Sequence, residues 1–278
     1  MTTITKDAGA RASVTSNPPR RFRRFRPRRS FWLGSLGVVL LLAVWEVASR
    51  AEWINPSIWS RPTDIAVAAV EYFTTGNGWS DVRVSGAEFL YGFLLAAVFG
   101  LVAGYAIGWW RWLDELTEPI VNFANASPRI ALVPILITMF GIGIASKVAV
   151  VFLAAVFPIL LNVRAGVRTV DRSLVEVAQS FKATNLQMLR TVFVPASIPS
   201  VITGMRLGIG QGLVGMVVGE LIASTAGLGF VINTAANQFR PDLAFVALFL
   251  VSGTGVLLSS VLKAVERRLD RWRPPVGA

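Results

Sequence analysis

The stretch DRSLVEVAQSFKATNLQMLRTVFVPASIP, from Asp171 to Pro199, is a polar segment between two long apolar runs. Its apolar residues recur at helical spacing: Leu174, Ala178, Phe181, Leu186, Leu189, Val192 and Phe193. This pattern predicts short amphipathic helices that need a partner surface. Asp171 or Ser173 can cap the first helix, and Glu176 lies in its first turns, where a carboxylate suits the helix dipole. We expect Pro195 and Pro199 to break the pattern before the next apolar run.

The composition indicates a membrane protein. Of the 278 residues, 54% are hydrophobic and 15% are charged, and the mean hydropathy is +0.59. A soluble domain carries about 25% charged residues. Several runs also reach the roughly 20 apolar residues that a helix needs to cross a bilayer. The sequence therefore predicts an all-α, polytopic membrane protein.

Six runs are long enough to be transmembrane helices, and they lie near 31–49, 84–109, 119–140, 145–163, 201–223 and 243–262. A short amphipathic helix is expected from Pro62 onward, and residues 110–118 and 224–242 are read as a turn and a loop. The predicted domains are a basic tail (1–30), a transmembrane domain (31–262) that contains the 171–199 loop, and a second tail (263–278).

The net charge of +11 indicates the orientation, because it gathers at the two ends and in the loop. The tract RRFRRFRPRR, Arg20–Arg29, precedes the first apolar run, and Arg164, Arg168 and Arg172 follow the fourth. Basic residues next to spans favour the cytoplasmic side, and a basic tract there contacts anionic headgroups rather than nucleic acid. We therefore expect a multi-pass protein of the bacterial cell membrane with both termini in the cytoplasm. The tail through Asn17 has the composition of a disordered segment.

Two of the apolar runs carry small residues four positions apart. The stripes are Gly92, Ala96, Gly100, Gly104 and Gly108 in the second run, and Gly204, Gly208 and Gly212 in the fifth, continued by Gly215 and Gly219. Such stripes let helix backbones approach closely in lipid. They predict tight helix neighbours and no substrate contact.

Polar residues inside the runs are candidates for a substrate pathway: Asn125, Ser127, Arg129, Gln211 and Glu220. Ser127 followed by proline can start a new helix, so the third run is expected to be a broken helix whose positive end faces the pathway, beside Arg129. The alternative is a proline kink with Arg129 at a subunit contact or reaching the membrane interface. Glu220 lies near the outer end of its run, where it can reach water or pair with a neighbouring helix.

Enzymatic chemistry has little support in the sequence. The chain has no Cys and no His, its carboxylates are scattered, and it contains no Gly-Lys-Ser or Gly-Lys-Thr phosphate loop. We therefore expect no catalytic residue, no metal and no cofactor. Energy for transport must come from a partner or an ion gradient.

The sequence Glu176-Val177-Ala178 followed by Pro195 resembles the "EAA" loop of ABC-importer permeases. From Pro62 to the end, the chain resembles the nitrate/sulfonate/taurine group, including PRIALVPILITMFGIGIASKV at 128–148. In that family the loop forms coupling helices that dock into an ATPase subunit. The resemblance gives this role to Glu176, Ala178, Phe181, Lys182, Ala183, Leu186 and Pro195.

One residue departs from the family pattern, because Lys182 stands where the family has a glycine. That glycine lets the loop bend between its two helices. In this chain we expect either a bend shifted to 183–185 or a straighter loop. The alternative for the whole segment is an amphipathic helix lying on lipid headgroups.

The resemblance implies a type I ABC importer permease with six spans. Its partners would be a second permease copy, two ATPase subunits and an extracytoplasmic solute-binding protein, and its substrate a small anion such as a sulfonate, taurine or nitrate. Two other readings remain open. One is a gradient-driven carrier or channel, which usually has several ionisable residues in its spans. The other is a membrane scaffold whose basic ends recruit proteins.

Overall fold

A computed structural model describes residues 27–55 and 58–269, and every regular element among them is a helix. The chain divides into two units, Met1–Val44 and Trp45–Ala278. The described part of the first unit is most of the apolar helix α1 (Pro27–Arg50). The disorder predicted through Asn17, most of the basic tract and the end of the second tail lie outside the described residues.

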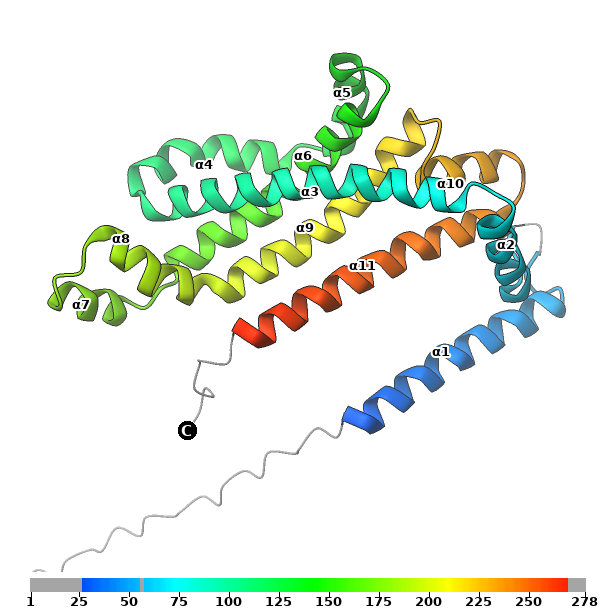
Figure 1. The fold of residues 1–278 in the computed structure, drawn as a ribbon, viewed down its shortest axis with the longest axis horizontal. Helices are drawn as coiled ribbons and strands as arrows, with labels where there is room; N and C mark the ends of the chain where they lie inside the picture. The colour runs from blue at the N-terminus through cyan, green and yellow to red at the C-terminus, as the bar shows by residue number, and fades with distance from the viewer. Residues whose placement is uncertain (1–26, 56–57, 270–278) are drawn as a thin grey trace, which may run out of the picture. The chain divides into compact units, whose positions relative to one another are not determined.

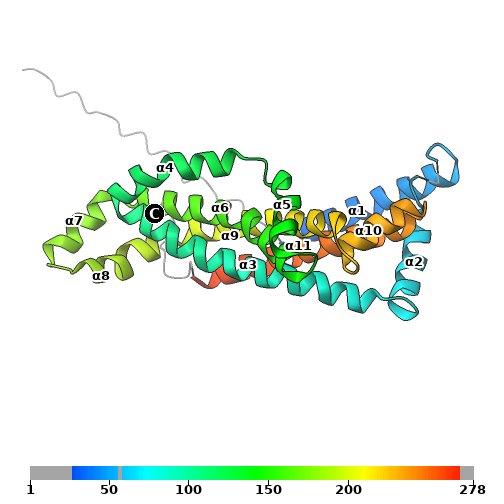
Figure 2. The ribbon, with the colours of Figure 1, turned by 90° about the horizontal axis from the view of Figure 1, so that it is seen from above.

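The second unit holds the remaining helices (Figure 1). They are α2 (Pro62–Thr74), α3 (Gly78–Trp109), α4 (Arg111–Ala126), η1 (Arg129–Leu132), α5 (Val133–Phe140), α6 (Ile144–Arg168), α7 (Arg172–Ser180), α8 (Asn185–Met188), the π-helical turn η2 (Leu189–Phe193), α9 (Val194–Ile222), α10 (Leu228–Asn237) and α11 (Pro241–Leu269). Helices α3, α6 and α9 run side by side (Figures 1 and 2). The α7–α8 segment lies at one end of this unit, and α2 and α10 lie at the other (Figure 1).

The helices agree with the predicted spans. Within the described residues, five helices are long and apolar enough to cross a membrane, and a sixth span results if the bent pair α4 and η1–α5 is counted as one. The two parts of that pair meet at an angle of 86°. The predicted break in the third run is therefore confirmed, and the short helix expected from Pro62 is α2.

Three predicted boundaries are wrong. Pro195 and Pro199 do not end a helix, because α9 begins at Val194 and continues through both. Pro195 stands in the first turn, where a missing N–H leaves no bond unmade. Residues 110–118 are not a free turn but mostly the first turns of α4, and the loop predicted at 224–242 contains α10.

The core forms where α6 packs between α3 and α9. Among its completely buried side chains are Val151, Ile159 and Val163 of α6. A Cβ on Gly104 of α3 would lie 2.7 Å from the Val163 Cβ, and one on Gly208 of α9 would lie 2.9 Å from the Ile159 side chain. The tight neighbour that both stripes predict is therefore the same helix, α6.

Close packing makes a testable distinction between two glycines of α3. We expect Gly104→Ala to lower the free energy of unfolding by about 1–3 kcal/mol, because its methyl group would collide with Val163. Gly86→Ala is the matched control, since a Cβ there meets no atom within 4 Å and alanine favours a helix by about 1 kcal/mol over glycine. Thermal unfolding of the purified protein in detergent measures both. Equal stability of the two variants would contradict the close approach.

Candidate functional site

The segment after α6 folds as two short helices, each with a side-chain cap. The Ser173 N–H donates to the Asp171 carboxylate at 2.9 Å, so Asp171 rather than Ser173 caps α7. This hydrogen bond holds the pKa of the exposed Asp171 below its usual range. At the start of α8, Thr184 and Gln187 each cap the other's backbone N–H. The short amphipathic helices predicted for this segment are confirmed, and side-chain caps within the segment determine where each one begins.

The bend between the two helices lies at Lys182 itself. Lys182 has φ +55°, in the left-handed region that favours glycine. Its N–H donates to the Gln179 carbonyl at 2.8 Å, and the Ala183 N–H donates to the Ala178 carbonyl at 3.0 Å. These bonds satisfy carbonyls at the end of α7, as left-handed helix caps do. Both expectations, a bend shifted to 183–185 and a straighter loop, are wrong.

The two helices leave apolar side chains uncovered. No residue of α7 or α8 is buried, and the Phe181 side chain is 84% exposed. Leu174, Val177 and Leu186 are at least half exposed as well. Ala178, Ala183 and Pro195 are half-buried, whereas Glu176 and Lys182 are exposed. The α7–α8 segment thus presents an apolar surface that this chain does not cover.

A buried carboxylate joins this end of α6 to α4. Asp114 of α4 forms ion pairs with Arg164 and Arg168, one turn apart on α6, and Arg164 also lies 3.8 Å from the Glu118 carboxylate. From the sequence these arginines predicted only the orientation, and the cluster, which we call the Asp114 clamp, was not expected. The signals available in the sequence were two arginines at helical spacing after the fourth run and the acidic residues Asp114, Glu115 and Glu118 after the second.

The broken helix brings three predicted pathway residues together. The Arg129 guanidinium donates to the Asn125 side-chain oxygen at 2.6 Å and lies 5.3 Å from the centre of the Phe157 ring. Arg129 and Gln211 line the same cavity of about 60 Å³ between η1, α5, α6 and α9. Ser127 does not start the next helix, because its hydroxyl donates to the Phe123 carbonyl at 2.9 Å and so closes α4.

Glu220 lies elsewhere, in a buried polar network. Its side chain is among the least exposed of the described residues, at 1%. The Ser85 hydroxyl of α3 donates to one carboxylate oxygen at 2.6 Å, and the Gly229 N–H donates to the other at 2.5 Å. Of the two expectations for Glu220, contact with water is therefore wrong and pairing with a neighbouring helix is confirmed.

The same network holds the first turn of α10. The Leu228 N–H donates to the Ser85 hydroxyl and the Gly227 N–H to the Asp81 carboxylate, each at 2.8 Å. Asp81 also accepts from the Tyr72 hydroxyl at 2.8 Å. Burial, and to a lesser extent this hydrogen bond, raises the pKa of the Tyr72 phenol. The hydroxyl therefore stays protonated and can donate. Free N–H groups at a helix start need partners, and here side chains of α3 and α9 supply them.

A second buried charge pair lies nearby. The Lys147 ammonium of α6 is 3.6 Å from the Glu88 carboxylate of α3, and both side chains are buried. Arg129 and Glu220 were the ionisable residues among the predicted pathway candidates, and this pair was not expected from the sequence. Its signal was a single charge in each of two apolar runs. The pair ties α3 to the end of α6 opposite the Asp114 clamp.

The geometry agrees with comparisons to known proteins. The family described as "Binding-protein-dependent transport system inner membrane component" matches residues 96–271. The chain belongs to this family. It is 30% identical to the taurine transport system permease protein TauC of Escherichia coli over 249 residues, which are 88% of this chain and 90% of that protein.

Two further relatives of the permease are named for different substrates. A putative aliphatic sulfonates transport permease protein, SsuC of Bacillus subtilis, is 29% identical over 89% of this chain and 90% of that protein. The riboflavin transport system permease protein RibX of Chloroflexus aurantiacus is 32% identical over 90% and 94%. An inward-facing structure of the MetNI methionine ABC transporter has the same fold, with a TM-score of 0.62 at 18% identity, over 69% of this chain and 95% of that chain.

The Asp114 clamp gives a test that needs no partner protein. We expect Asp114→Asn to lower the free energy of unfolding by roughly 3 kcal/mol, because it leaves two arginines beside a neutral group in a buried place. Glu115→Gln is the matched control: it removes an exposed ion pair with Arg111 on the same helix, and such pairs contribute less than about 1 kcal/mol. Chemical or thermal unfolding in detergent measures the difference. Equal loss in the two variants would show that the buried clamp adds no more stability than an exposed ion pair.

Proposed function

We propose that this permease imports a small organic anion of the sulfonate class, as a pair of identical chains driven by two ATPase subunits. The observation that carries the proposal is the uncovered apolar surface of α7 and α8. Amphipathic helices are stable when their apolar face has a partner. The EAA-like sequence around Glu176 fits an ATPase as that partner, and Phe181 is its most exposed apolar side chain.

The orientation follows from the same segment. A surface that binds an ATPase lies in the cytoplasm, together with the basic residues Arg164, Arg168 and Arg172. The positive-inside rule supports this side and places both termini there. The end of the unit with α2 and α10 then faces outward, where a solute-binding protein would deliver its cargo.

The clamp offers a route by which ATPase movement reaches the pathway. A displacement of α7 moves the end of α6, which Asp114 joins to the start of α4. Helix α4 ends next to Arg129, whose side chain bonds to Asn125 of that helix. Helices transmit such displacements as rigid elements between their ends. Opening of the pathway would thus follow from tilting of α4 against η1.

The substrate class rests on the Arg129 cavity. Guanidinium groups recognise planar or tetrahedral oxyanions through several N–H donors. Gln211 adds an amide to the same cavity. The name of SsuC refers to aliphatic sulfonates and that of TauC to taurine, which carries a sulfonate group. Sulfonate groups are oxyanions, which agrees with a cationic group in the pathway. The small cavity of one chain would be half of a pathway formed between two copies.

The docking role predicts which exposed phenylalanine matters. We expect Phe181→Ser to reduce co-purification of the ATPase with the permease by about tenfold or more, because a buried aromatic anchor contributes roughly 2 kcal/mol to an interface. Phe239→Ser is the control, since Phe239 directly follows the C-cap of α10 and is similarly exposed, at 88%. Glu176→Lys should also reduce co-purification of the ATPase. Undiminished complex formation and uptake in the Phe181 and Glu176 variants would rule out docking through this segment.

The pathway role of Arg129 is tested by uptake. We expect Arg129→Gln to slow sulfonate uptake about tenfold, as expected when a charge-assisted hydrogen bond is lost, while assembly with the ATPase is retained. Arg83→Gln, an exposed arginine of α3, serves as the control. Uptake and ATP hydrolysis are measured in the same reconstituted vesicles. Loss of assembly would instead assign Arg129 to packing, and normal uptake would remove it from the pathway.

A further inference from the structure

A groove between α9 and α11 combines a charged end with an apolar length. It has a volume of about 530 Å³ and is open on one side. Arg206, Ile209 and Gly210 line it from α9, and Ser252, Gly255, Val256, Ser259, Ser260 and Lys263 line it from α11. Pockets that hold organic ligands have volumes of about 300–1,000 Å³. The groove is therefore large enough for more than a single ion.

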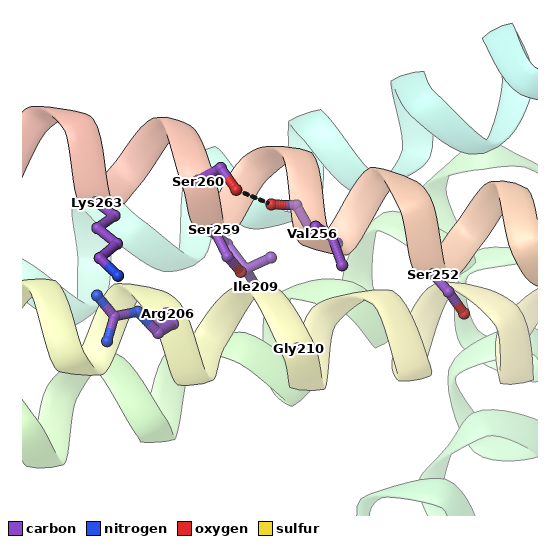
Figure 3. Close-up of a pocket in the computed structure, with 9 residues that line it drawn as sticks. Arg206, Ile209, Gly210, Ser252, Val256, Ser259, Ser260 and Lys263 are labelled. Atoms are coloured by element: carbon purple, nitrogen blue, oxygen red, sulfur yellow. Dashed lines mark hydrogen bonds between the residues drawn. The ribbon is translucent and has the colours of Figure 1, made fainter. Parts of the chain in front are cut away.

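Two cations meet at one end of the groove. In Figure 3 the side chains of Arg206 and Lys263 point toward each other from neighbouring helices. Arg206 pairs with Glu266 at 3.1 Å, whereas Lys263 has no ion-pair partner within the described part of the chain. One carboxylate against two cations leaves one unbalanced positive charge. That end of the groove is therefore suited to a singly charged anion.

The rest of the groove is less polar and is partly unfilled. A Cβ on Gly210 would meet no atom within 4 Å, so the glycine leaves open space. The Ser260 hydroxyl donates a hydrogen bond to the Val256 carbonyl at 2.7 Å. Among the described residues, the hydroxyls of Ser252 and Ser259 have no hydrogen-bond partner. Ile209 and Val256 supply apolar surface between the two ends (Figure 3).

The depth of the charged end matches a membrane interface. Lys263 lies 22 residues after Pro241, so the helix rise of 1.5 Å places it ~33 Å along α11. The hydrocarbon core of a bilayer is about 30 Å thick. The basic residues Arg267 and Arg268 follow about one helical turn later. In a groove with this arrangement, the cations lie at the level of lipid headgroups and the apolar lining can contact an acyl chain.

We propose that this groove binds an anionic glycerophospholipid, with its phosphodiester between Arg206 and Lys263 and one acyl chain along Gly210 and Val256. Basic pockets between transmembrane helices are established sites for anionic headgroups. The open apolar length argues for a lipid rather than a free anion. In the orientation proposed above, the headgroup would lie in the inner leaflet. The site and its chemistry do not depend on that orientation.

The test compares lipids that differ only in their headgroup. The full-length permease, purified in detergent, is titrated with dioleoyl-phosphatidylglycerol or dioleoyl-phosphatidylcholine, and bound lipid is counted by native mass spectrometry. We expect tighter binding of phosphatidylglycerol. Lys263→Gln should weaken that binding about fivefold, the contribution of one basic residue near a membrane surface. Arg268→Gln, which lies outside the groove on the same helix, should leave it unchanged.

Two further arms identify what fills the groove. Gly210→Leu places a side chain in open space, so it should reduce phosphatidylglycerol binding while both cations remain in place. Glycerophosphate, as a free anion, should bind at least tenfold more weakly than the lipid. The proposal is overturned if Lys263→Gln and Arg268→Gln bind the lipid equally, if Gly210→Leu has no effect, or if a free anion binds as tightly. None of these measurements uses the ATPase or uptake, so they succeed or fail independently of the proposed transport function.

Discussion

The close approach of α6 to α3 and α9 is the constraint on which the rest of the second unit depends. In lipid there is no hydrophobic force to drive helices together, so contact must come from fit and from polar bonds. Glycines on α3 and α9 remove the side chains that would separate the helices, and Val151, Ile159 and Val163 of α6 occupy the space. The ends of α6 are fixed by charge: Lys147 pairs with Glu88 at one end, and Arg164 and Arg168 pair with Asp114 at the other. A helix held along its length and at both ends moves as a rigid element.

Buried polar groups follow the same logic, because no water is available to satisfy them inside a membrane. Glu220 is buried at 1% exposure, yet both of its carboxylate oxygens accept hydrogen bonds. Those bonds fix the start of α10 to α3 and α9. The end of the unit with α2 and α10 is thus assembled by side-chain caps, whereas the packed centre of α3, α6 and α9 is assembled by glycines. The two kinds of contact divide the unit into a rigid centre and polar ends. Separating the helices at a polar end would break hydrogen bonds and leave the close packing of the centre intact.

The sequence was sufficient for features that depend on local order. The length of the apolar runs located the spans, the four-residue stripes indicated tight packing, and Asp171 was one of two predicted caps. It was insufficient where partners are distant in the chain. Ser85 and Glu220 are separated by 135 positions, and neither has a neighbour in sequence that points to the other. The ion pairs of Asp114 with Arg164 and Arg168 were missed for the same reason, because the partners lie far apart in the chain. Proline rules also misled, since Pro195 lies in a first turn, where the rule against proline does not apply.

Lys182 shows how the bend between α7 and α8 is determined. A left-handed conformation costs an L-residue about 1–2 kcal/mol relative to glycine. The bend nevertheless occurs at Lys182, because the Lys182 and Ala183 N–H groups bond to the last carbonyls of α7, and the Thr184–Gln187 capping box starts α8 directly afterwards. These backbone and cap bonds define the angle between the helices, and the residue in the turn must adopt it. The apolar surface formed by Val177, Phe181 and Leu186 therefore has its shape before any partner binds. A preformed surface loses less conformational entropy on docking than a flexible one.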